Sequence, residues 1–355
     1  MKCEKGWLLA SIIFLICTMA SAQIALTPQS DAGKGIPTLP FQIVAAESPE
    51  THEQNAIQSE VVTLLQSTNF DELDRVAEKL RISKECWATG SLKLGSFYSG
   101  LVPSDENPDA VWDERIGSLD NWIAAKPKSI TARVALAYVL TEYAWKARGG
   151  DWADKVSDDG WRLFFARLND ANEVLTHAKQ LPEKCPVYWS AQMQVALGLQ
   201  TPRPAFDVIF NEATNYDSHY KMYFYRRALY LLPRWYGTEG EWESDLATSA
   251  DRIGGEEGDE LYAQVIWCVH ETAASKNIFE ENHLSWPRVN RGFDLIEKRF
   301  PDSLSATSEH ARLAVLAGDR IAAQKCFARL GGKLDLTIWK SEARFLRFAR
   351  WAYTE

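Results

Sequence analysis

Residues 300–330 read FPDSLSATSEHARLAVLAGDRIAAQKCFARL, and this stretch decides the fold class. Ser303 is placed to cap a helix that ends near Leu316, and after a turn at Gly318 a second helix runs back to Leu330. One helical hairpin cannot bury its apolar face alone, so the stretch predicts neighbours of the same kind stacked on both sides. Such stacks are typical of binding scaffolds.

The same pattern extends through most of the chain. Apolar residues recur at steps of three and four, as in the stripe formed by Trp112, Ile116, Leu119 and Ile123. Two junctions repeat a proline followed two residues later by serine, at 127–129 and 301–303, where proline ends one helix and serine caps the next. We therefore predict an all-α protein without β-sheet, built as a tetratricopeptide-like α-α solenoid of roughly six to seven helical pairs.

The first 22 residues have the pattern of a secretory signal peptide. Lys2 and Lys5 precede an apolar run at 7–16, which is too short to span a bilayer comfortably, and residues 20–22 are Ala-Ser-Ala. These small side chains fit a signal peptidase site. We expect cleavage after Ala22 and export to the periplasm or the extracellular medium.

A lipid anchor at Cys17 is the alternative to cleavage after Ala22. Ile16 disfavours lipidation, because the residue before a lipid-bearing cysteine is normally small. Residues 23–50 follow with four prolines and two glycines, which predicts an extended or disordered tether. The helical-repeat domain is then expected over residues 51–355, with its clearest single repeat at 300–330.

The charge balance is acidic. The whole chain carries a formal net charge of −9, and removal of Lys2, Lys5 and Glu4 with the signal peptide makes it −10. An acidic chain is a poor general partner for nucleic acid, because phosphate binding requires clustered Lys and Arg. No second long apolar run follows residue 16, so we expect no integral membrane segment in the mature chain.

Four cysteines remain after the signal peptide: Cys86, Cys185, Cys268 and Cys326. They are far apart and form no Cys-x-x-Cys pair, so we expect neither a metal site nor a cofactor, because structural zinc sites usually use closely spaced ligand pairs. In an oxidising compartment, a disulfide bond between two of these cysteines is the alternative to free thiols. The apolar surroundings of Cys268 and Cys326 favour buried free thiols.

Short segments between residues 60 and 270 carry a resemblance. They read FDELD at 70–74, LRISK at 80–84, FY at 97–98, YAWKARG at 143–149, GW at 160–161, PRW at 233–235 and GGEEGD at 254–259. Together they resemble a bacterial family of unknown function, number 4034, whose members are helical and similar to tetratricopeptide repeats. Tyr236 stands where that pattern leads us to expect glycine, which leaves the geometry of this turn open. The resemblance implies a helical architecture and no assigned activity.

Arginine beside aromatic residues at flexible turns marks the candidate binding surface, because this combination is enriched in binding hot spots. Arg148-Gly149-Gly150-Asp151-Trp152 is one such cluster, and Arg234-Trp235-Tyr236-Gly237 is the second. The helix before the second cluster adds further aromatic rings and cations. The candidates from these segments are Arg148, Trp152, Tyr223, Arg227, Arg234 and Trp235. The alternative for all of them is packing between helices, with the arginines in local ion pairs.

Acidic residues at 256–259 give the only hint of an acid–base pair, and we keep Glu257 and Asp259 as candidates. Their alternative role is to stabilise the first turn of a helix. His270-Glu271 begins like a zinc-protease motif, but Ala274 replaces the second histidine. The sequence contains no nucleophile elbow and no phosphate-binding loop, so we name no catalytic residue.

The preferred interpretation is an exported helical-repeat scaffold that binds a peptide or protein partner through a groove lined by arginine and aromatic residues. The alternative is a hydrolase of cell-envelope polymer with an acidic residue pair in a tryptophan-lined cleft. The absence of a metal-binding or covalent-catalysis motif makes the enzyme the less favoured of the two.

Overall fold

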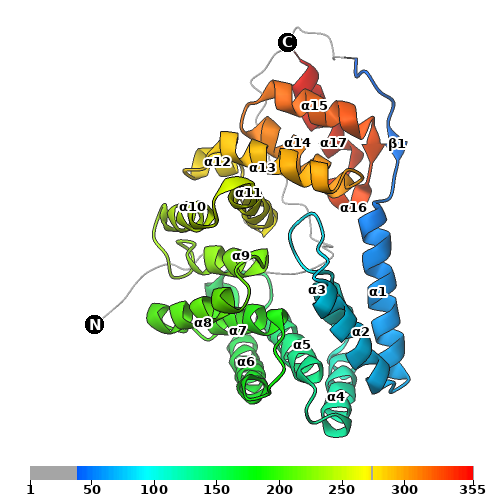
Figure 1. Ribbon diagram of the computed structural model, residues 1–355, viewed down its shortest axis with the longest axis vertical. Coiled ribbons are helices and arrows are strands. Elements are labelled where there is room, and N and C mark those ends of the chain that lie inside the picture. Colours follow the sequence, from blue (N-terminus) through cyan, green and yellow to red (C-terminus); the bar gives the residue numbers. More distant parts are fainter. Residues whose placement is uncertain (1–37, 273–274, 355) are drawn as a thin grey trace. The chain divides into compact units, whose positions relative to one another are not determined.

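The computed structural model describes residues 38–272 and 275–354. Over these residues the chain forms seventeen α-helices, one turn of 3₁₀ helix and two very short strands, which confirms the all-α class (Figure 1). The expected signal peptide at 1–22 lies outside the described residues. So do residues 23–37 of the expected tether.

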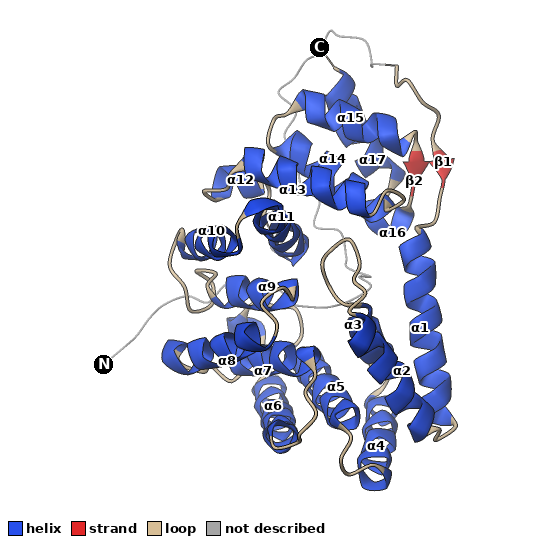
Figure 2. Cartoon of the chain, viewed as in Figure 1, coloured by secondary structure: helices blue, strands red, loops and turns tan. Residues whose placement is uncertain are grey.

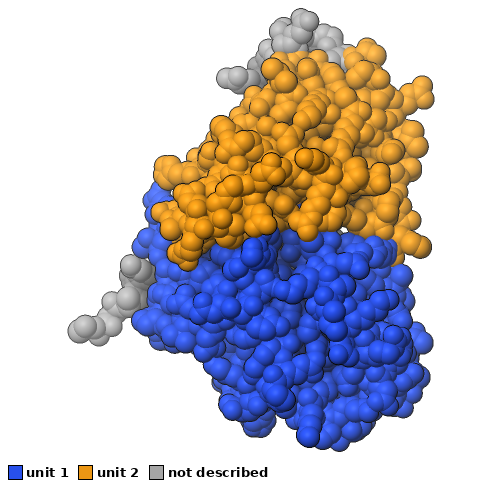
Figure 3. Space-filling model, in the orientation of Figure 1, with its two compact units in different colours: residues 1–14, 53–242 blue, residues 15–52, 243–355 orange. Residues whose placement is uncertain are grey.

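The chain divides into two compact units, which are coloured separately in Figure 3. Among the described residues, unit 1 covers 53–242, and unit 2 covers 38–52 together with 243–354. Unit 2 is therefore assembled from two separate stretches of the sequence. The expected single helical-repeat domain over 51–355 stays a prediction.

Unit 1 contains most of α1 and the helices that follow it, with η1 as the 3₁₀ turn. Their bounds are α1 (Pro49–Gln66), α2 (Phe70–Ser83), α3 (Lys93–Gly100), α4 (Asp109–Ala125), α5 (Ile130–Arg148), η1 (Ala153–Lys155), α6 (Asp158–Lys179), α7 (Pro186–Gly198), α8 (Arg203–Tyr216) and α9 (Lys221–Tyr230). Helix α5 packs against α3, α4, α6 and α7. It is therefore the central helix of unit 1, and nearly all its side chains are buried.

Unit 2 contains the remaining helices and both strands. Their bounds are β1 (Val44–Ala45), α10 (Glu241–Ile253), α11 (Gly255–Thr272), α12 (Ile278–Glu281), α13 (Trp286–Arg299), α14 (Leu304–Leu316), α15 (Arg320–Leu330), β2 (Lys333–Leu334), α16 (Leu336–Trp339) and α17 (Glu342–Tyr353). Consecutive helices pack on one another from α13 to α15, and α17 packs on α14 and α15.

The predicted helix starts are confirmed at both proline–serine junctions. The Ser129 hydroxyl accepts a hydrogen bond from the backbone N–H of Ala132 at 3.0 Å and begins α5. Ser303 does the same for α14, accepting from Ala306 at 3.1 Å. In each case serine satisfies an amide of the first turn that has no partner within the helix.

The expectation of no β-sheet is wrong in one detail. Strands β1 and β2 pair in parallel over two residues each (Figure 2). Gly332, with a φ of +81°, allows this pairing, because a Cβ there would lie 1.9 Å from the carbonyl oxygen of Gln42. The Phe41 ring also packs edge-on against Phe345 at 6.2 Å. Residues 38–50, within the expected tether, are thus a folded part of unit 2.

Over residues 38–272 and 275–354, none of the helices combines the length and the hydropathy that a membrane span requires.

Candidate functional site

Unit 1 encloses a cavity of about 170 Å³ at the end of α5. Its lining is mainly aromatic, with one charged side chain: Trp145, Arg148, Ala153, Trp161, Phe164, Gly198, Gln200, Trp235 and Tyr236. Both predicted clusters contribute to it, since Arg148 comes from the first and Trp235 from the second.

Helix geometry explains how these side chains meet. Trp145 and Arg148 are three residues apart in the last turn of α5, so they lie on the same face. Gly149 follows with a φ of +71°, which ends the helix. Trp161 and Phe164, also three apart, lie near the start of α6. The loop after α9 brings Trp235 against Trp145, with ring centroids 6.0 Å apart.

Arg148 is the charged group of the cavity, and only 3% of its surface is exposed. Its Nη1 donates to the carbonyl oxygen of Gly149 at 2.6 Å, and its guanidinium carbon lies 5.5 Å from the ring centroid of Trp161. Its Nη2 is buried and has no acceptor among the described residues. Burial lowers the pKa of Arg148, but arginine stays charged because its ordinary pKa is very high.

Six indole N–H groups of the described residues share this condition, and two of them belong to the cavity lining. Nε1 of Trp145 and Nε1 of Trp235 are buried without an acceptor in the part of the chain that is described. Three residues lining one cavity thus carry hydrogen-bond donors for which residues 38–272 and 275–354 supply no acceptor. Since an unsatisfied buried donor is costly, the cavity is chemically suited to a ligand that supplies acceptor oxygens.

A comparison with family models gives one match, to the domain of unknown function DUF4034, over residues 58–195. Residues 58–195 are a DUF4034 domain. No curated protein and no solved structure matched the chain. The DUF4034 domain supplies Trp145, Arg148, Trp161 and Phe164 to the cavity, whereas Trp235 and Tyr236 lie beyond the matched residues.

Four of the six arginine and aromatic candidates do not line this cavity, and Arg234 is the fourth of them. Trp152, just after the Arg148 turn in the DUF4034 domain, is 42% exposed. Tyr223 is fully buried, and its hydroxyl donates to the carbonyl oxygen of Pro186 at 2.9 Å. Arg227 forms an ion pair with Asp207 at 2.7 Å. The last two have the packing roles that were the alternative to binding.

Arg234 lies next to Trp235 but is not part of the cavity lining. Its Nε and Nη2 are buried without an acceptor among the described residues, and burial lowers its pKa. Arg234 therefore offers a second set of unused donors in the same loop as Trp235.

Tyr236 occupies the turn where glycine was expected from the family pattern. Its hydroxyl donates to the carbonyl oxygen of Leu197 at 3.2 Å, and its ring stacks near Tyr230 with centroids 4.7 Å apart. The position that needs glycine is Gly237, because a Cβ there would lie 1.8 Å from the carbonyl oxygen of Leu231. The tyrosine is thus accommodated, and it lines the cavity.

The acidic candidates lie in unit 2. Glu257 is exposed in the first turn of α11. Asp259 lines an open depression of about 790 Å³, where Arg288 and Arg291 hold its two oxygens, each at 2.8 Å. A carboxylate neutralised on both oxygens is poorly placed for acid–base chemistry.

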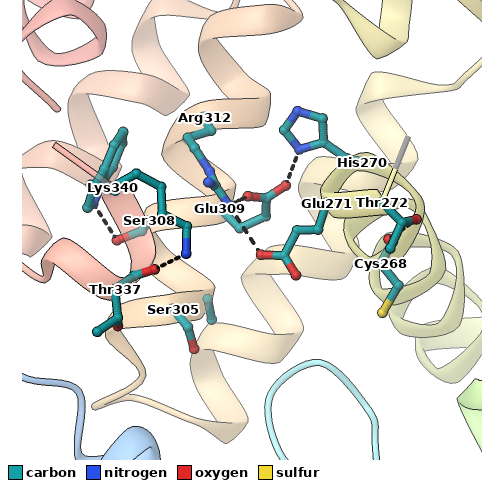
Figure 4. A network of polar contacts seen from close by, with 12 residues as sticks. Cys268, His270, Glu271, Thr272, Ser305, Ser308, Glu309, Arg312, Thr337 and Lys340 are labelled. Carbon is teal, nitrogen blue, oxygen red and sulfur yellow. Dashed lines mark hydrogen bonds and ion pairs between the residues drawn. The ribbon is translucent and has the colours of Figure 1, made fainter. Parts of the chain in front are cut away.

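Unit 2 also contains a buried network of charged groups (Figure 4). Glu309 on α14 is fully buried between His270, whose Nδ1 lies 2.5 Å away, and Arg312. Arg312 also reaches Glu271 at 3.4 Å. Burial opposes ionisation of Glu309, but Arg312 and His270 outweigh it and lower the pKa of Glu309 to about 2. The network joins α11 to α14.

Sequence reasoning missed Trp145, Trp161, Phe164 and Tyr236 as lining residues. A signal for Trp145 was present, because the spacing Trp145–Arg148 places both side chains on one helical face. The contribution of α6 depends on contacts between helices, which the sequence does not display.

Proposed function

We propose that this chain is an exported helical-repeat scaffold that binds a peptide or protein partner, and that the cavity of unit 1 receives a carboxylate from this partner. The observation that carries the proposal is the group of unused donors on Trp145, Arg148 and Trp235. A carboxylate offers several acceptor positions and neutralises the guanidinium. The surrounding aromatic rings supply apolar area for the rest of the bound residue.

The size of the cavity limits what can enter it. A volume of about 170 Å³ is close to the roughly 150 Å³ of an engineered cavity that holds benzene. It therefore suits one side chain or one chain end. We propose that the partner inserts a single residue, either a carboxyl-terminal residue or an acidic side chain, while other surfaces of the scaffold provide further contacts.

The scaffold part of the proposal extends the all-α architecture to a tetratricopeptide-like solenoid. Its support is the packing of helices that follow one another in the chain, such as α4 on α5, α5 on α6, α7 on α8 and α14 on α15.

The proposed export rests on the pattern of residues 1–22. Intact-mass analysis of the exported protein tests it, and the expected mass begins at Gln23, with cyclisation allowed. A mass that includes Trp7 or a lipid on Cys17 excludes this processing.

The experiment for binding uses N-acetylated tetrapeptides that end in different amino acids, each with a free carboxyl terminus or an amide. Titration is followed by the fluorescence of the cavity tryptophans. We expect at least one free acid to bind roughly 10-fold or more tightly than its amide, because a hydrogen bond to a charged group contributes about 1.5–3 kcal/mol. Arg148→Gln should remove this preference.

The matched control is Arg162→Gln on α6, because Arg162 is an exposed arginine that pairs with Asp159. It should leave peptide binding unchanged. Equal affinity of acids and amides, or equal loss in both variants, would contradict a carboxylate site at Arg148.

We give the hydrolase alternative less weight. Its acidic candidates are either exposed, as Glu257 is, or held by arginines, as Asp259 is. A release assay with purified cell-wall polymer tests it, since turnover that is lost in Asp259→Asn would restore it.

A further inference from the structure

Three consecutive helices of unit 2 bring a carboxylate, an imidazole and a thiol to one buried point. Glu297 lies on α13, His310 on α14 and Cys326 on α15. Their exposed fractions are 4%, 0% and 1%, and one ligand atom from each lies within 4.8 Å of the other two. Oxygen, nitrogen and sulfur donors of these kinds are the three ligand types that zinc uses in proteins.

The orientation of His310 is fixed by its neighbours. Its Nε2 lies 2.9 Å from Oδ1 of Asn290, and its Nδ1 lies 3.1 Å from Oε1 of Glu297. The ring also stacks on Phe293, with centroids 4.9 Å apart and planes at 16°. When Nε2 carries the proton and donates it to Asn290, the lone pair of Nδ1 faces a carboxylate oxygen. A cation between Nδ1 of His310 and Oε1 of Glu297 would attract both atoms and remove the repulsion between them.

Glu297 is arranged in a similar way. Its Oε2 accepts from Nη1 of Arg329 at 2.7 Å, which leaves Oε1 directed toward His310. Arg329 Nη2 is anchored in turn by the carbonyl oxygens of Glu297 and Pro301, at 3.1 and 2.9 Å. Asn290 and Arg329 thus hold the outer sides of two ligands, as outer-shell partners do in metal sites.

We propose that Glu297, His310 and Cys326 bind one zinc ion that ties α13, α14 and α15 together. The carboxylate and a Cys326 thiolate together neutralise the two positive charges of zinc. Bonds of about 2.0–2.3 Å place tetrahedral ligand atoms roughly 3.3–3.8 Å apart. The Nδ1–Oε1 distance of 3.1 Å is already close to this value, and a shift of roughly 1 Å brings the Cys326 sulfur to the same range.

The first test uses the chain without substitutions. After removal of metal with EDTA and dialysis, zinc is titrated in competition with a chromophoric chelator. One zinc per chain should bind, zinc but not magnesium should raise the thermal midpoint, and X-ray absorption should show one sulfur ligand at about 2.3 Å. The absence of stoichiometric binding, or a shell with nitrogen and oxygen alone, overturns the proposal.

The second test assigns the ligands. Cys326→Ser and His310→Gln should each weaken zinc binding by at least ~10-fold. The controls are Cys185→Ser, a buried thiol of unit 1 beside the Tyr98 hydroxyl, and His270→Gln, whose imidazole contacts Glu309. Both controls should keep the affinity of the unsubstituted chain.

Cobalt provides the spectroscopic signature of the thiolate. Its sulfur charge-transfer band should be present in the unsubstituted chain and in Cys185→Ser, and absent in Cys326→Ser. A band that survives in Cys326→Ser overturns the assignment. If circular dichroism shows that Cys326→Ser does not fold, X-ray absorption of the unsubstituted chain decides the question. Without zinc binding, the three side chains are a polar packing contact in which the His310 ring lies between the amide oxygen of Asn290 and the carboxylate of Glu297.

Discussion

The indole rings of Trp145 and Trp235 meet edge to face, with centroids 6.0 Å apart and planes at 89°. Trp145 belongs to the DUF4034 domain, whereas Trp235 lies beyond residue 195. The candidate cavity is therefore completed by a loop outside the matched residues. A shortened protein that ends at residue 195 would lack Trp235 and Tyr236, and with them part of the cavity lining.

Replacement of Arg148 should separate binding from stability. Arg148→Met retains an unbranched apolar stem and removes a buried guanidinium whose Nη2 has no acceptor among the described residues. We expect the free energy of unfolding of unit 1 to fall by no more than about 1 kcal/mol, or to rise, because burial of an incompletely paired charge is costly. Binding of free-acid peptides should be lost. Calorimetry and peptide titration measure the two effects.

Arg167→Met is the matched control for Arg148→Met. Arg167 donates to the carbonyl oxygen of Tyr143 at 2.9 Å and lies over the Tyr143 ring, so its contacts are made within the protein. We expect it to destabilise unit 1 by roughly 1–3 kcal/mol. Equal destabilisation by the two variants would show that Arg148 is a structural residue.

Gly292 allows α13 to approach α11 closely. A Cβ at this position would lie 2.3 Å from the carbonyl oxygen of Asp259 and 2.6 Å from the Cβ of Ala263. Both neighbours belong to a packed helix, so Gly292→Ala should lower the free energy of unfolding of unit 2 by about 1–3 kcal/mol. In contrast, a Cβ added at Gly117 in α4 would have no atom within 4 Å. Gly117→Ala should therefore stabilise unit 1 by about 0.5–1 kcal/mol. A neutral Gly292→Ala would contradict the close helix approach.

Glu142 should make unit 1 less stable as the pH rises. Burial raises the pKa of Glu142 to about 7, against the opposing effects of Arg226 and Gln194. The folded state then holds a proton that the unfolded state releases near pH 4.5. Stability therefore falls between about pH 4.5 and pH 7 and levels off above.

Glu142→Gln removes this titration and retains a side chain that can pair with Gln194. We expect the variant to be about 1–3 kcal/mol more stable than the unsubstituted chain at pH 8 and similar to it near pH 4.5. Denaturant unfolding at both pH values measures the difference. A constant difference across this range would show that Glu142 is ionised in the folded state.

Glu309 should have the opposite effect on unit 2. Its pKa of about 2 lies below the ordinary value of 4.5, so its stabilising contribution is present above about pH 4.5 and is lost as the pH falls toward 2. Glu309→Gln leaves Arg312 buried without its main partner and should cost about 3–5 kcal/mol at neutral pH. In thermal melts between pH 2 and 7, the midpoint temperature of this variant should fall less steeply at acidic pH. Glu280→Gln, at an exposed position of α12, should show the same fall of the midpoint temperature at acidic pH as the unsubstituted chain.

Local features of the fold were predictable because they depend on neighbours in the sequence. Ser303 and the turn at Gly318, whose φ is +75°, mark the hairpin of α14 and α15 at the expected residues. The packing of Phe41 on Phe345 was not predictable, because it joins residues about 300 positions apart and has no periodic signal. The short strand pairing follows from the same long-range contact.

The candidate site was predictable in part. Arginine and tryptophan beside a glycine turn led to the choice of Arg148 and Trp235, and the structure brings these two residues to one cavity, while their role in binding stays a prediction. The same reasoning could not exclude Trp152, because local sequence does not determine which side of a turn faces the protein. Glu297, His310 and Cys326 were not recognised as a group, since ligand spacing in sequence is uninformative when three successive helices each contribute one side chain.

The pairing of β1 with β2 has a consequence for the order in which the chain folds. Residues 38–52 leave the ribosome before any of unit 1, but their partners on β2 and α17 come more than 280 residues later. The described residues of unit 1, 53–242, are continuous in sequence and are able to fold as soon as they have been synthesised. Unit 2 cannot complete its fold until nearly the last residue of the chain has been synthesised. Until then, Phe41 and the edge of β1 lack their covering, and a chaperone that binds extended apolar segments would find its substrate there.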